Sequence, residues 1–289
     1  MNLNKNVLIA GGDCRQTYLA RFLLGYFEKI YTIGFNMTLS FDRIIPLDTL
    51  DSLDKKIDVL ILPPVTTNDG ATVNTPFYDK NLYIDDVLQR LNKGARVYGG
   101  KLSDKLKGSL SYQGFCPFDY LLDERFIVNN TLPTAEGALM IALEETPFVL
   151  YGAKTAILGY GRVGATTASL FKNVGAEVFV FDRKEEKRKI AQSKNLNAFD
   201  FFDDKLFDCD IIINTVSSKV LTKERLKQIK REALIIDLAS KPGGVDLEYA
   251  KLRGLNVIWA LSLPGRVAPV TSGEIIGKTI ISDLTKGGV

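Results

Sequence analysis

A glycine-rich segment in the second half of the chain has the residue types and spacing that hold a phosphate group. It consists of Gly159, Tyr160, Gly161, Arg162, Val163 and Gly164, after a strand-like run and before a helical pattern. In such a turn the first glycine permits a tight bend and the second lets backbone approach a pyrophosphate at the helix N-terminus. The third lets helix and strand pack closely. The segment therefore predicts a dinucleotide-binding turn; the alternative is a doubly wound domain with an incidental glycine turn.

An acidic residue supports this prediction. Asp182 ends the next strand-like run, eighteen residues after Gly164. A carboxylate at this place can accept both ribose hydroxyls of a dinucleotide. It favours NAD because it would repel a 2′-phosphate, whereas the adjacent Arg183 could pair with that phosphate. We therefore expect NAD or NADP, with NAD favoured.

Polar residues at two later strand ends extend the predicted site. Asn214, Thr215 and Val216 follow one apolar run, and Asp237 and Lys241 follow the next. Ligands of open α/β sheets lie outside the carboxyl ends of the strands, so these residues are expected on the cofactor side. The alternative is that the segment from Lys241 to Gly244 is simply a turn.

The N-terminal segment Gly11–Arg15 resembles the glycine turn only in part. A third glycine is missing, and Asp13 and Arg15 occupy places where small residues would admit phosphates. The guanidinium of Arg15 instead suits a carboxylate. The first half of the chain is therefore predicted to bind a substrate, the alternative being that Arg15 is a surface helix residue.

Short apolar runs alternate with helical patterns along the whole chain. This alternation predicts α/β architecture, with two tandem doubly wound parallel-sheet domains, of which the second is a Rossmann dinucleotide-binding domain. A helix with Gly94 at its C-terminal cap is predicted over 85–94. The expected strands are 6–10, 30–35, 59–63, 95–100, 155–159, 177–182, 210–215, 233–238 and 256–261.

The predicted domains are residues 1–132, for substrate and catalysis, and residues 133–289, for NAD(P). A connecting helix is expected over 133–146, with Pro133 in its first turn, Glu136 near its positive end and Pro147 stopping it. The tail over 271–289 is helical in period and is expected to pack back on the first domain.

Composition narrows the function classes. The chain has 289 residues, 37 basic and 34 acidic, without the clustered basic residues typical of nucleic-acid binding. It has no histidine, which excludes a catalytic imidazole and a His-ligated zinc. Three dispersed cysteines predict neither disulfides nor a metal site and favour a reducing cytoplasm. No apolar run is long enough for a membrane span.

Several segments together resemble the A-subunit family of dipicolinate synthase from sporulating bacteria. They are GGDCRQ near the start, LPTAEGALMIAL at the junction, LGYGRVGATTA, DLASKPGGVDLEYA and LPGRVAPVTSGEII. The resemblance implies NAD(P)-dependent oxidation of dihydrodipicolinate, or of its hydroxylated tetrahydro precursor, to dipicolinate in the mother-cell cytoplasm. It also implies a flavoprotein-like partner, the B subunit of dipicolinate synthase, and a small dicarboxylate substrate held in a cleft between domains. A homo-oligomer is left open.

Under this resemblance four residues are the catalytic candidates. Arg15 and Arg266 would bind the two carboxylates, and Asp13 and Glu136 are the candidate proton acceptors. Forming an aromatic ring is downhill, so positioning matters more than a strong base. Glu136 has the alternative of merely capping its helix, and Arg266 that of a surface loop residue. Lys101 is a further cleft candidate, outside the proposed set because the resemblance is poor there.

The sequence departs from the family pattern at two places. Lys241 stands where the family has an arginine, and the acid at Asp182 is missing from a relative. Two rival interpretations stay open. One is an oxidoreductase resembling alanine and 2-hydroxyacid dehydrogenases, of which the hydroxyacid type is disfavoured by the lack of histidine. The other is a non-catalytic regulatory protein that binds a dinucleotide.

Overall fold

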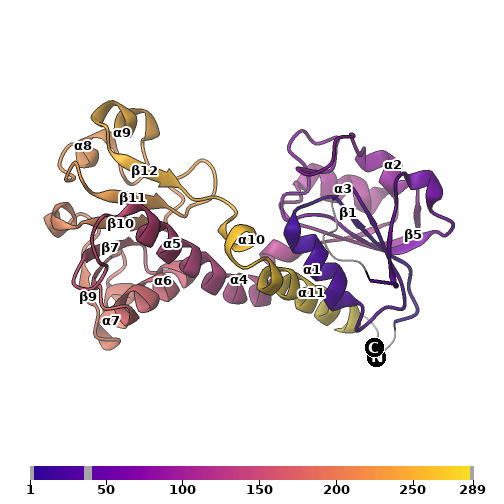
Figure 1. The fold of residues 1–289 in the computed structure, drawn as a ribbon, viewed down its shortest axis with the longest axis horizontal. Coiled ribbons are helices and arrows are strands. Elements are labelled where there is room, and N and C mark those ends of the chain that lie inside the picture. Colours follow the sequence, from indigo (N-terminus) through magenta and orange to yellow (C-terminus); the bar gives the residue numbers. More distant parts are fainter. Residues whose placement is uncertain (1–2, 36–40, 287–289) are drawn as a thin grey trace. The chain divides into compact units, whose positions relative to one another are not determined.

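The computed structural model describes residues 3–35 and 41–286, which form two compact units (Figure 1). Unit 1 comprises Met1–Asn129 and Ala268–Val289, and unit 2 comprises Asn130–Val267. The first boundary lies three residues before the predicted one. The tail belongs to unit 1, so the prediction that it packs back on the first domain is confirmed. The predicted bounds 133–289 had nevertheless counted it with the nucleotide-binding domain.

Unit 1 is built on a six-stranded parallel sheet. Its order is β3-β2-β1-β4-β5-β6, so the strand order reverses between β1 and β4. Ligands of doubly wound sheets bind at such a reversal, outside the carboxyl ends of the strands. The strands are β1 (Val7–Ala10), β2 (Ile30–Ile33), β3 (Ile44–Pro46), β4 (Ile57–Ile61), β5 (Leu91–Gly99) and β6 (Cys116–Asp119). The edge strands β3 and β6 were not predicted.

Helices cover both faces of this sheet (Figure 1). One face packs against α1 (Cys14–Leu23), α4 (Glu124–Asn129) and the tail helix α11 (Pro269–Lys286). The other packs against α2 (Ile84–Leu88) and α3 (Asp104–Tyr112). Two glycines let α11 approach α1 closely, since a Cβ on Gly273 would lie 2.6 Å from the Arg15 carbonyl oxygen. On Gly277 it would lie 2.3 Å from the ring of Phe22.

The helix predicted over 85–94 is wrong in its second half. Helix α2 ends at Leu88, and β5 begins three residues later at Leu91. Gly94 has a φ of +78° and lies within β5, beside a register shift against β4, so it does not cap a helix. Leu91 is buried in the sheet core, as Val87 and Leu88 are in the helix. The helical spacing of these apolar residues was therefore misleading.

Unit 2 repeats the architecture with the sheet order β12-β11-β10-β7-β8-β9, all parallel. One core lies beneath α5, α6, α7 and α10, and the other beneath α8 and α9. The strands are β7 (Lys154–Leu158), β8 (Glu177–Phe181), β9 (Asn197–Phe199), β10 (Ile211–Asn214), β11 (Leu234–Asp237) and β12 (Asn256–Trp259). The helices are α5 (Thr131–Glu145), α6 (Arg162–Asn173), α7 (Glu185–Ser193), α8 (Lys223–Leu226), α9 (Leu247–Arg253) and α10 (Leu263–Val267).

The helix that opens unit 2 begins earlier than predicted. Helix α5 starts at Thr131, which places Pro133 in its first turn and Glu136 beyond that turn. The first turn contains no acidic residue, so the predicted interaction of Glu136 with the positive helix end is wrong. The helix ends at Glu145, two residues before Pro147, because the residue preceding a proline disfavours helical backbone.

Candidate functional site

The glycine turn of unit 2 joins the end of β7 to the start of α6, and two of its glycines are required by packing. Gly159 has a φ of +88°, and a Cβ there would lie 2.7 Å from the Val216 side chain. A Cβ on Gly164 would lie 2.0 Å from the Gly159 carbonyl oxygen. These contacts hold helix and strand at a distance that only glycine permits.

Gly161 differs from the other two glycines of the turn. A Cβ built on it would meet no protein atom within 4 Å, and its φ of −83° is open to any residue. It is also the N-cap of α6, and no side chain makes a cap hydrogen bond there in the described structure. Such an open, uncapped helix N-terminus favours an anion. The residues therefore fit the pyrophosphate of a dinucleotide, which would lie against Gly161.

Asp182, which follows β8, is held beside this turn. Its Oδ2 accepts a hydrogen bond from the Tyr160 backbone N–H at 2.7 Å, and its Oδ1 accepts one from the Lys184 N–H at 2.9 Å. The two oxygens of a carboxylate have further lone pairs for ribose hydroxyls. The neighbouring Arg183 is exposed, with its guanidinium carbon 5.2 Å from the centre of the Phe201 ring.

Tyr160 contributes to the turn through its backbone. Its side chain is 3% exposed and belongs to the core beneath α5 and α6. Burial raises the pKa of its phenol, and within the described residues the hydroxyl has no hydrogen-bond partner. The ring therefore anchors the glycine turn to the core while its N–H fixes Asp182.

Asn214 and Asp237 form a buried pair at the ends of β10 and β11. The Asn214 amide donates to Asp237 Oδ1 at 2.7 Å, and both side chains are at most 1% exposed. Asp237 also accepts from the N–H groups of Ala239 at 3.0 Å and Gly244 at 2.8 Å. These side chains were predicted to face the cofactor. Their contacts are with protein instead, and they support the two loops that follow the strands.

The remaining residues predicted for unit 2 lie in three kinds of position. Thr215 and Val216 are half-buried against the glycine turn, with Thr215 Oγ1 donating to the Leu158 carbonyl at 2.9 Å. Val163 is half-buried on the first turn of α6, and Arg162 is exposed beside it. Lys241, in the loop after β11, and Arg266, on α10, are exposed.

The glycine pair of unit 1 is closed by its own chain. The Gly11 N–H donates to the Ile33 carbonyl at 2.8 Å, and the Gly12 N–H donates to the Asn74 carbonyl at 2.9 Å. A Cβ on Gly11 would lie 2.5 Å from Val73. The segment over 73–75 thus occupies the place where a phosphate would approach. This agrees with the prediction that unit 1 is not a second dinucleotide domain.

The N-terminus of α1 is capped by its own side chains. Asp13 is the N-cap residue and accepts the Arg15 N–H, while Gln16 Oε1 accepts the Asp13 N–H at 3.0 Å. The same Asp13 carboxylate accepts two hydrogen bonds from the Arg15 guanidinium, at 2.8 and 2.6 Å. Sequence reasoning named both residues but missed that they pair with each other.

This pairing limits what Asp13 does chemically. Burial by itself would raise the pKa of the Asp13 carboxyl, but the hydrogen bonds and charge of Arg15 outweigh it and hold the pKa below its ordinary value. A carboxylate stabilised in this way is a weak proton acceptor. Arg15 is 8% exposed, and its charge acts on the phenol of the fully buried Tyr120, a neighbour that no sequence motif indicated.

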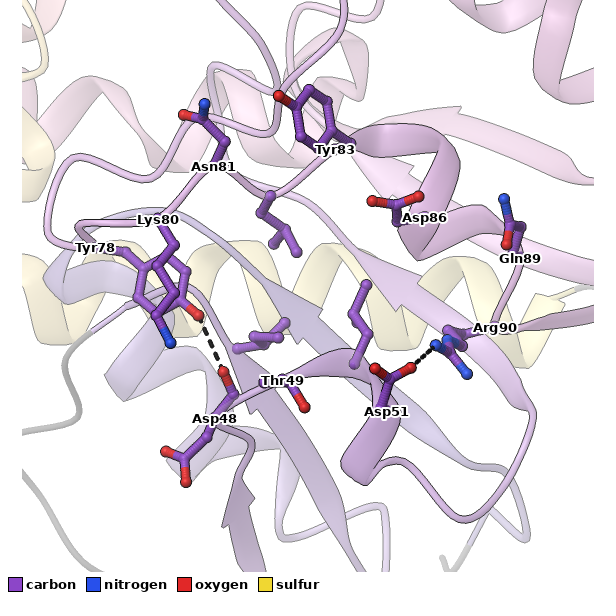
Figure 2. Close-up of a pocket in the computed structure, with 13 residues that line it drawn as sticks. Asp48, Thr49, Asp51, Tyr78, Lys80, Asn81, Tyr83, Asp86, Gln89 and Arg90 are labelled. Carbon is purple, nitrogen blue, oxygen red and sulfur yellow. Dashed lines mark hydrogen bonds and ion pairs between the residues drawn. The ribbon is translucent and has the colours of Figure 1, made fainter.

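A separate pocket of about 350 Å³ in unit 1 is lined mostly by polar residues (Figure 2). They come from the segments 48–51 and 78–83 and from α2 and its C-terminal end. Arg90 forms an ion pair with Asp51, and Tyr78 Oη donates to the Asp48 carbonyl at 3.1 Å. The pocket contains none of the residues predicted to act, and we assign it no function.

Comparison with known proteins agrees with this division of the chain. Residues 6–121 match the family model described as the N-terminal domain of the dipicolinate synthase A subunit. Residues 136–243 match the model described as D-isomer specific 2-hydroxyacid dehydrogenase, NAD binding domain. Across the part of the chain that the structure describes, no helix has the length and apolar character to cross a membrane.

Individual relatives cover almost the whole chain. The dipicolinate synthase A subunit of Bacillus subtilis is 31% identical over 281 residues, covering 95% of this chain and 94% of that protein. The crystal structure of the A subunit from Bacillus halodurans has a TM-score of 0.91 at 31% identity, covering 98% of this chain and 99% of that one. A Sinorhizobium meliloti transhydrogenase shares the fold, with a TM-score of 0.70 at 14% identity over 96% of this chain and 92% of that one.

The fold and the glycine turn define a protein of two doubly wound α/β units, the second of which is an NAD-binding domain of the type found in dehydrogenases. The second unit has the Rossmann strand order, glycine turn and strand-end acid. Within this class the chain belongs to the A-subunit family of dipicolinate synthase.

Proposed function

We propose that this protein oxidises dihydrodipicolinate, or its hydroxylated tetrahydro precursor with loss of water, to dipicolinate with a nicotinamide dinucleotide. The observation on which the proposal rests is the open face of Gly161 beside a fixed Asp182, in a chain of the dipicolinate synthase A-subunit family. Unit 2 would hold the dinucleotide and unit 1 the substrate. The closed glycine pair at Gly11 and Gly12 supports this assignment, because it offers no place for a second phosphate.

The oxidation of a dihydropyridine removes a hydride and a proton and creates an aromatic ring. A nicotinamide dinucleotide held by unit 2 would supply the acceptor for the hydride. The chain then has to orient the dicarboxylate and exclude water. Arg15 suits the first task, since Asp13 fixes its guanidinium bidentately and so holds it in place for a substrate carboxylate. Arg266 is the second candidate cation. Glu136 is the remaining candidate for taking the proton, since the pairing with Arg15 makes Asp13 a weak acceptor.

NAD is the proposed form of the cofactor. Two backbone N–H groups hold the Asp182 carboxylate in place, so that it cannot turn away without losing both bonds. A fixed negative charge at the ribose hydroxyls repels a 2′-phosphate. Arg183, which would pair with such a phosphate, has its guanidinium over the Phe201 ring instead.

The proposal includes a partner and a setting. The name of the family denotes one component of a synthase, and we propose its flavoprotein-like B subunit as the partner, in the cytoplasm of a sporulating mother cell. Two rival functions stay open to test: oxidation of an alanine-like or 2-hydroxy acid, and non-catalytic dinucleotide binding. The likeness to L-alanine dehydrogenase, at 12% identity, shows the fold alone.

Absorbance at 340 nm during turnover tests the proposal. The purified chain should reduce NAD faster than NADP with enzymatically generated dihydrodipicolinate, and should leave L-alanine and lactate unchanged. Reduction only after the B subunit is added would favour the regulatory alternative. Turnover of L-alanine in place of dihydrodipicolinate would overturn the proposal.

A further inference from the structure

Lys101 has a backbone conformation that a lysine rarely adopts. Its φ is 51°, and the other non-glycine residues with positive φ in the described structure are Asn195 and Ser262. Steric contact of Cβ with the backbone makes this left-handed region unfavourable for a lysine, while glycine adopts it freely. Strained backbone of this kind clusters at functional sites, where the side chain has a use.

The residues on both sides of Lys101 are fixed. The Gly100 N–H donates to the Pro63 carbonyl at 3.1 Å, and a Cβ on Gly100 would lie 2.3 Å from the Pro64 carbonyl oxygen. The Leu102 N–H donates to Asp119 Oδ2 at 2.9 Å. The Lys101 side chain between them is exposed, and its ammonium pairs with no carboxylate of the described residues. The backbone therefore presents an unpaired cation from a rigid turn.

This cation lies at the same edge of the unit 1 sheet as Arg15. Arg15 follows β1 and Lys101 follows β5, and β4 pairs with both strands in parallel. Two strand spacings separate β1 from β5 by about 10 Å, within reach of two long side chains that converge on one small ligand. The segment after β6 links them further: Tyr120 lies within the electrostatic influence of Arg15, and Leu121 lies next to Gly100.

The charges at this edge favour a role for Lys101. Within five residues after the end of each strand of the sheet, the basic residues are Arg15 and Lys101. Asp13 neutralises Arg15 through its two hydrogen bonds. Lys101 is therefore the one of these two basic residues whose charge no ion pair of the described residues offsets, which leaves its ammonium available to a ligand carboxylate.

We propose that Lys101 binds the second carboxylate of the substrate and makes unit 1 selective for dicarboxylates. This inference rests on the proposed function, since it takes the substrate to be a pyridine dicarboxylate. It assigns to unit 1 a contact for each carboxylate, Arg15 for one and Lys101, in place of Arg266, for the other.

Calorimetric titration of the full chain saturated with NADH tests the proposal, with pyridine-2,6-dicarboxylate and pyridine-2-carboxylate as the two probes. In Lys101→Met the dicarboxylate should bind at least tenfold more weakly, while the monocarboxylate binds nearly as it does to the unaltered chain. Lys101→Arg should restore most of the preference. Lys105→Met, which removes an exposed lysine from the adjacent α3, is the matched control and should change neither affinity.

A second variant separates binding from folding. Lys101→Gly relieves the left-handed strain, so its thermal midpoint should equal or exceed that of the unaltered chain while dicarboxylate binding weakens as in Lys101→Met. Unchanged binding of both probes by Lys101→Met and Lys101→Gly would overturn the role of Lys101 and leave the proposed function standing. Failure of the unaltered chain to bind the dicarboxylate would overturn the proposed function, and this inference with it.

Discussion

The carboxylate of Asp182 accepts a hydrogen bond from the backbone N–H of Tyr160 at 2.7 Å, which ties the end of β8 to the glycine turn after β7. The Tyr160 ring is buried in the core beneath α5 and α6, so the turn and the acid are held by the same residue. The two parts of a dinucleotide site that are read separately in the sequence are therefore one rigid unit in the structure.

Replacing Asp182 by asparagine should weaken the binding of NAD more than the binding of NADP. The charge that receives the ribose hydroxyls is lost, which costs about 1.5–3 kcal/mol, or roughly 10- to 150-fold in the dissociation constant for NAD. The affinity for NADP should fall less, because the substitution also relieves the repulsion of its 2′-phosphate. Fluorescence titration with NADH and NADPH measures both constants. Glu186→Gln, on the exposed surface of α7, is the control; a ratio of the constants unaltered by Asp182→Asn would contradict the assignment.

Two alanine substitutions in the glycine turn should have opposite effects on dinucleotide affinity and on folding stability. In Gly161→Ala the new methyl group meets no protein atom, so folding should be unaffected, while dinucleotide affinity falls about tenfold or more because the pyrophosphate loses its close approach. In Gly164→Ala the methyl group would lie 2.0 Å from a carbonyl oxygen, so stability should fall by about 1–3 kcal/mol. Urea unfolding and calorimetry of both variants make the comparison. Full NADH affinity in Gly161→Ala would show that the phosphates lie elsewhere.

The Asp13–Arg15 pair should stabilise unit 1 in a pH-dependent way. Because the pKa of Asp13 is lowered in the folded chain, its contribution is present above the unfolded-state pKa and is lost as pH falls through the folded value. Asp13→Asn should therefore cost about 1–3 kcal/mol at pH 7, and the difference should shrink below about pH 4. Urea midpoints at several pH values, followed by circular dichroism, measure this. An equal difference at pH 7 and pH 3 would mean that the charge of Asp13 is not what stabilises the fold.

The tail helix should be an integral part of unit 1. A Cβ on Gly273 would lie 2.6 Å and 2.7 Å from backbone atoms of Arg15 and Leu19, so Gly273→Ala should force α11 away from α1 and cost about 1–3 kcal/mol. Gly108→Ala, in the exposed middle of α3, meets nothing within 4 Å and should instead stabilise by about 0.5–1 kcal/mol. Thermal unfolding of both variants is the measurement. Equal midpoints would refute the close packing of α11 on α1.

The strands were predictable where both faces of a segment are covered. Buried runs such as Val7–Ala10 and Ile211–Asn214 are strands because both faces are covered, and that leaves an uninterrupted apolar pattern. The edge strands Ile44–Pro46 and Asn197–Phe199 are three residues long and partly exposed, so they leave no such pattern. The prediction for Gly94 was wrong because a glycine with positive φ can either cap a helix or bend a strand. Only the pairing of β5 with β4 shows that it bends a strand here.

The site was predictable to a similar extent. The roles of Gly159 and Gly164 follow from local geometry, and the structure gives the close contacts expected. The burial of the Asp237 side chain could not be predicted from local sequence. Its Oδ2 accepts a hydrogen bond from the Gly244 N–H, and only the turn after β11 brings Gly244 back to Asp237. The pairing of Asp13 with Arg15 was missed for another reason: two residues apart, their side chains meet only because Asp13 caps the helix in whose first turn Arg15 lies. Strand-end polar residues thus indicate the region of a site but not which side chains face a ligand.

A crystal structure of the chain grown with NAD tests the central claim most directly. The account predicts the pyrophosphate against the open face of Gly161 at the N-terminus of α6, with the adenosine ribose hydroxyls donating to Asp182. A dinucleotide bound at Gly11 and Gly12 of unit 1, or density for the phosphates away from Gly161 in unit 2, would contradict it.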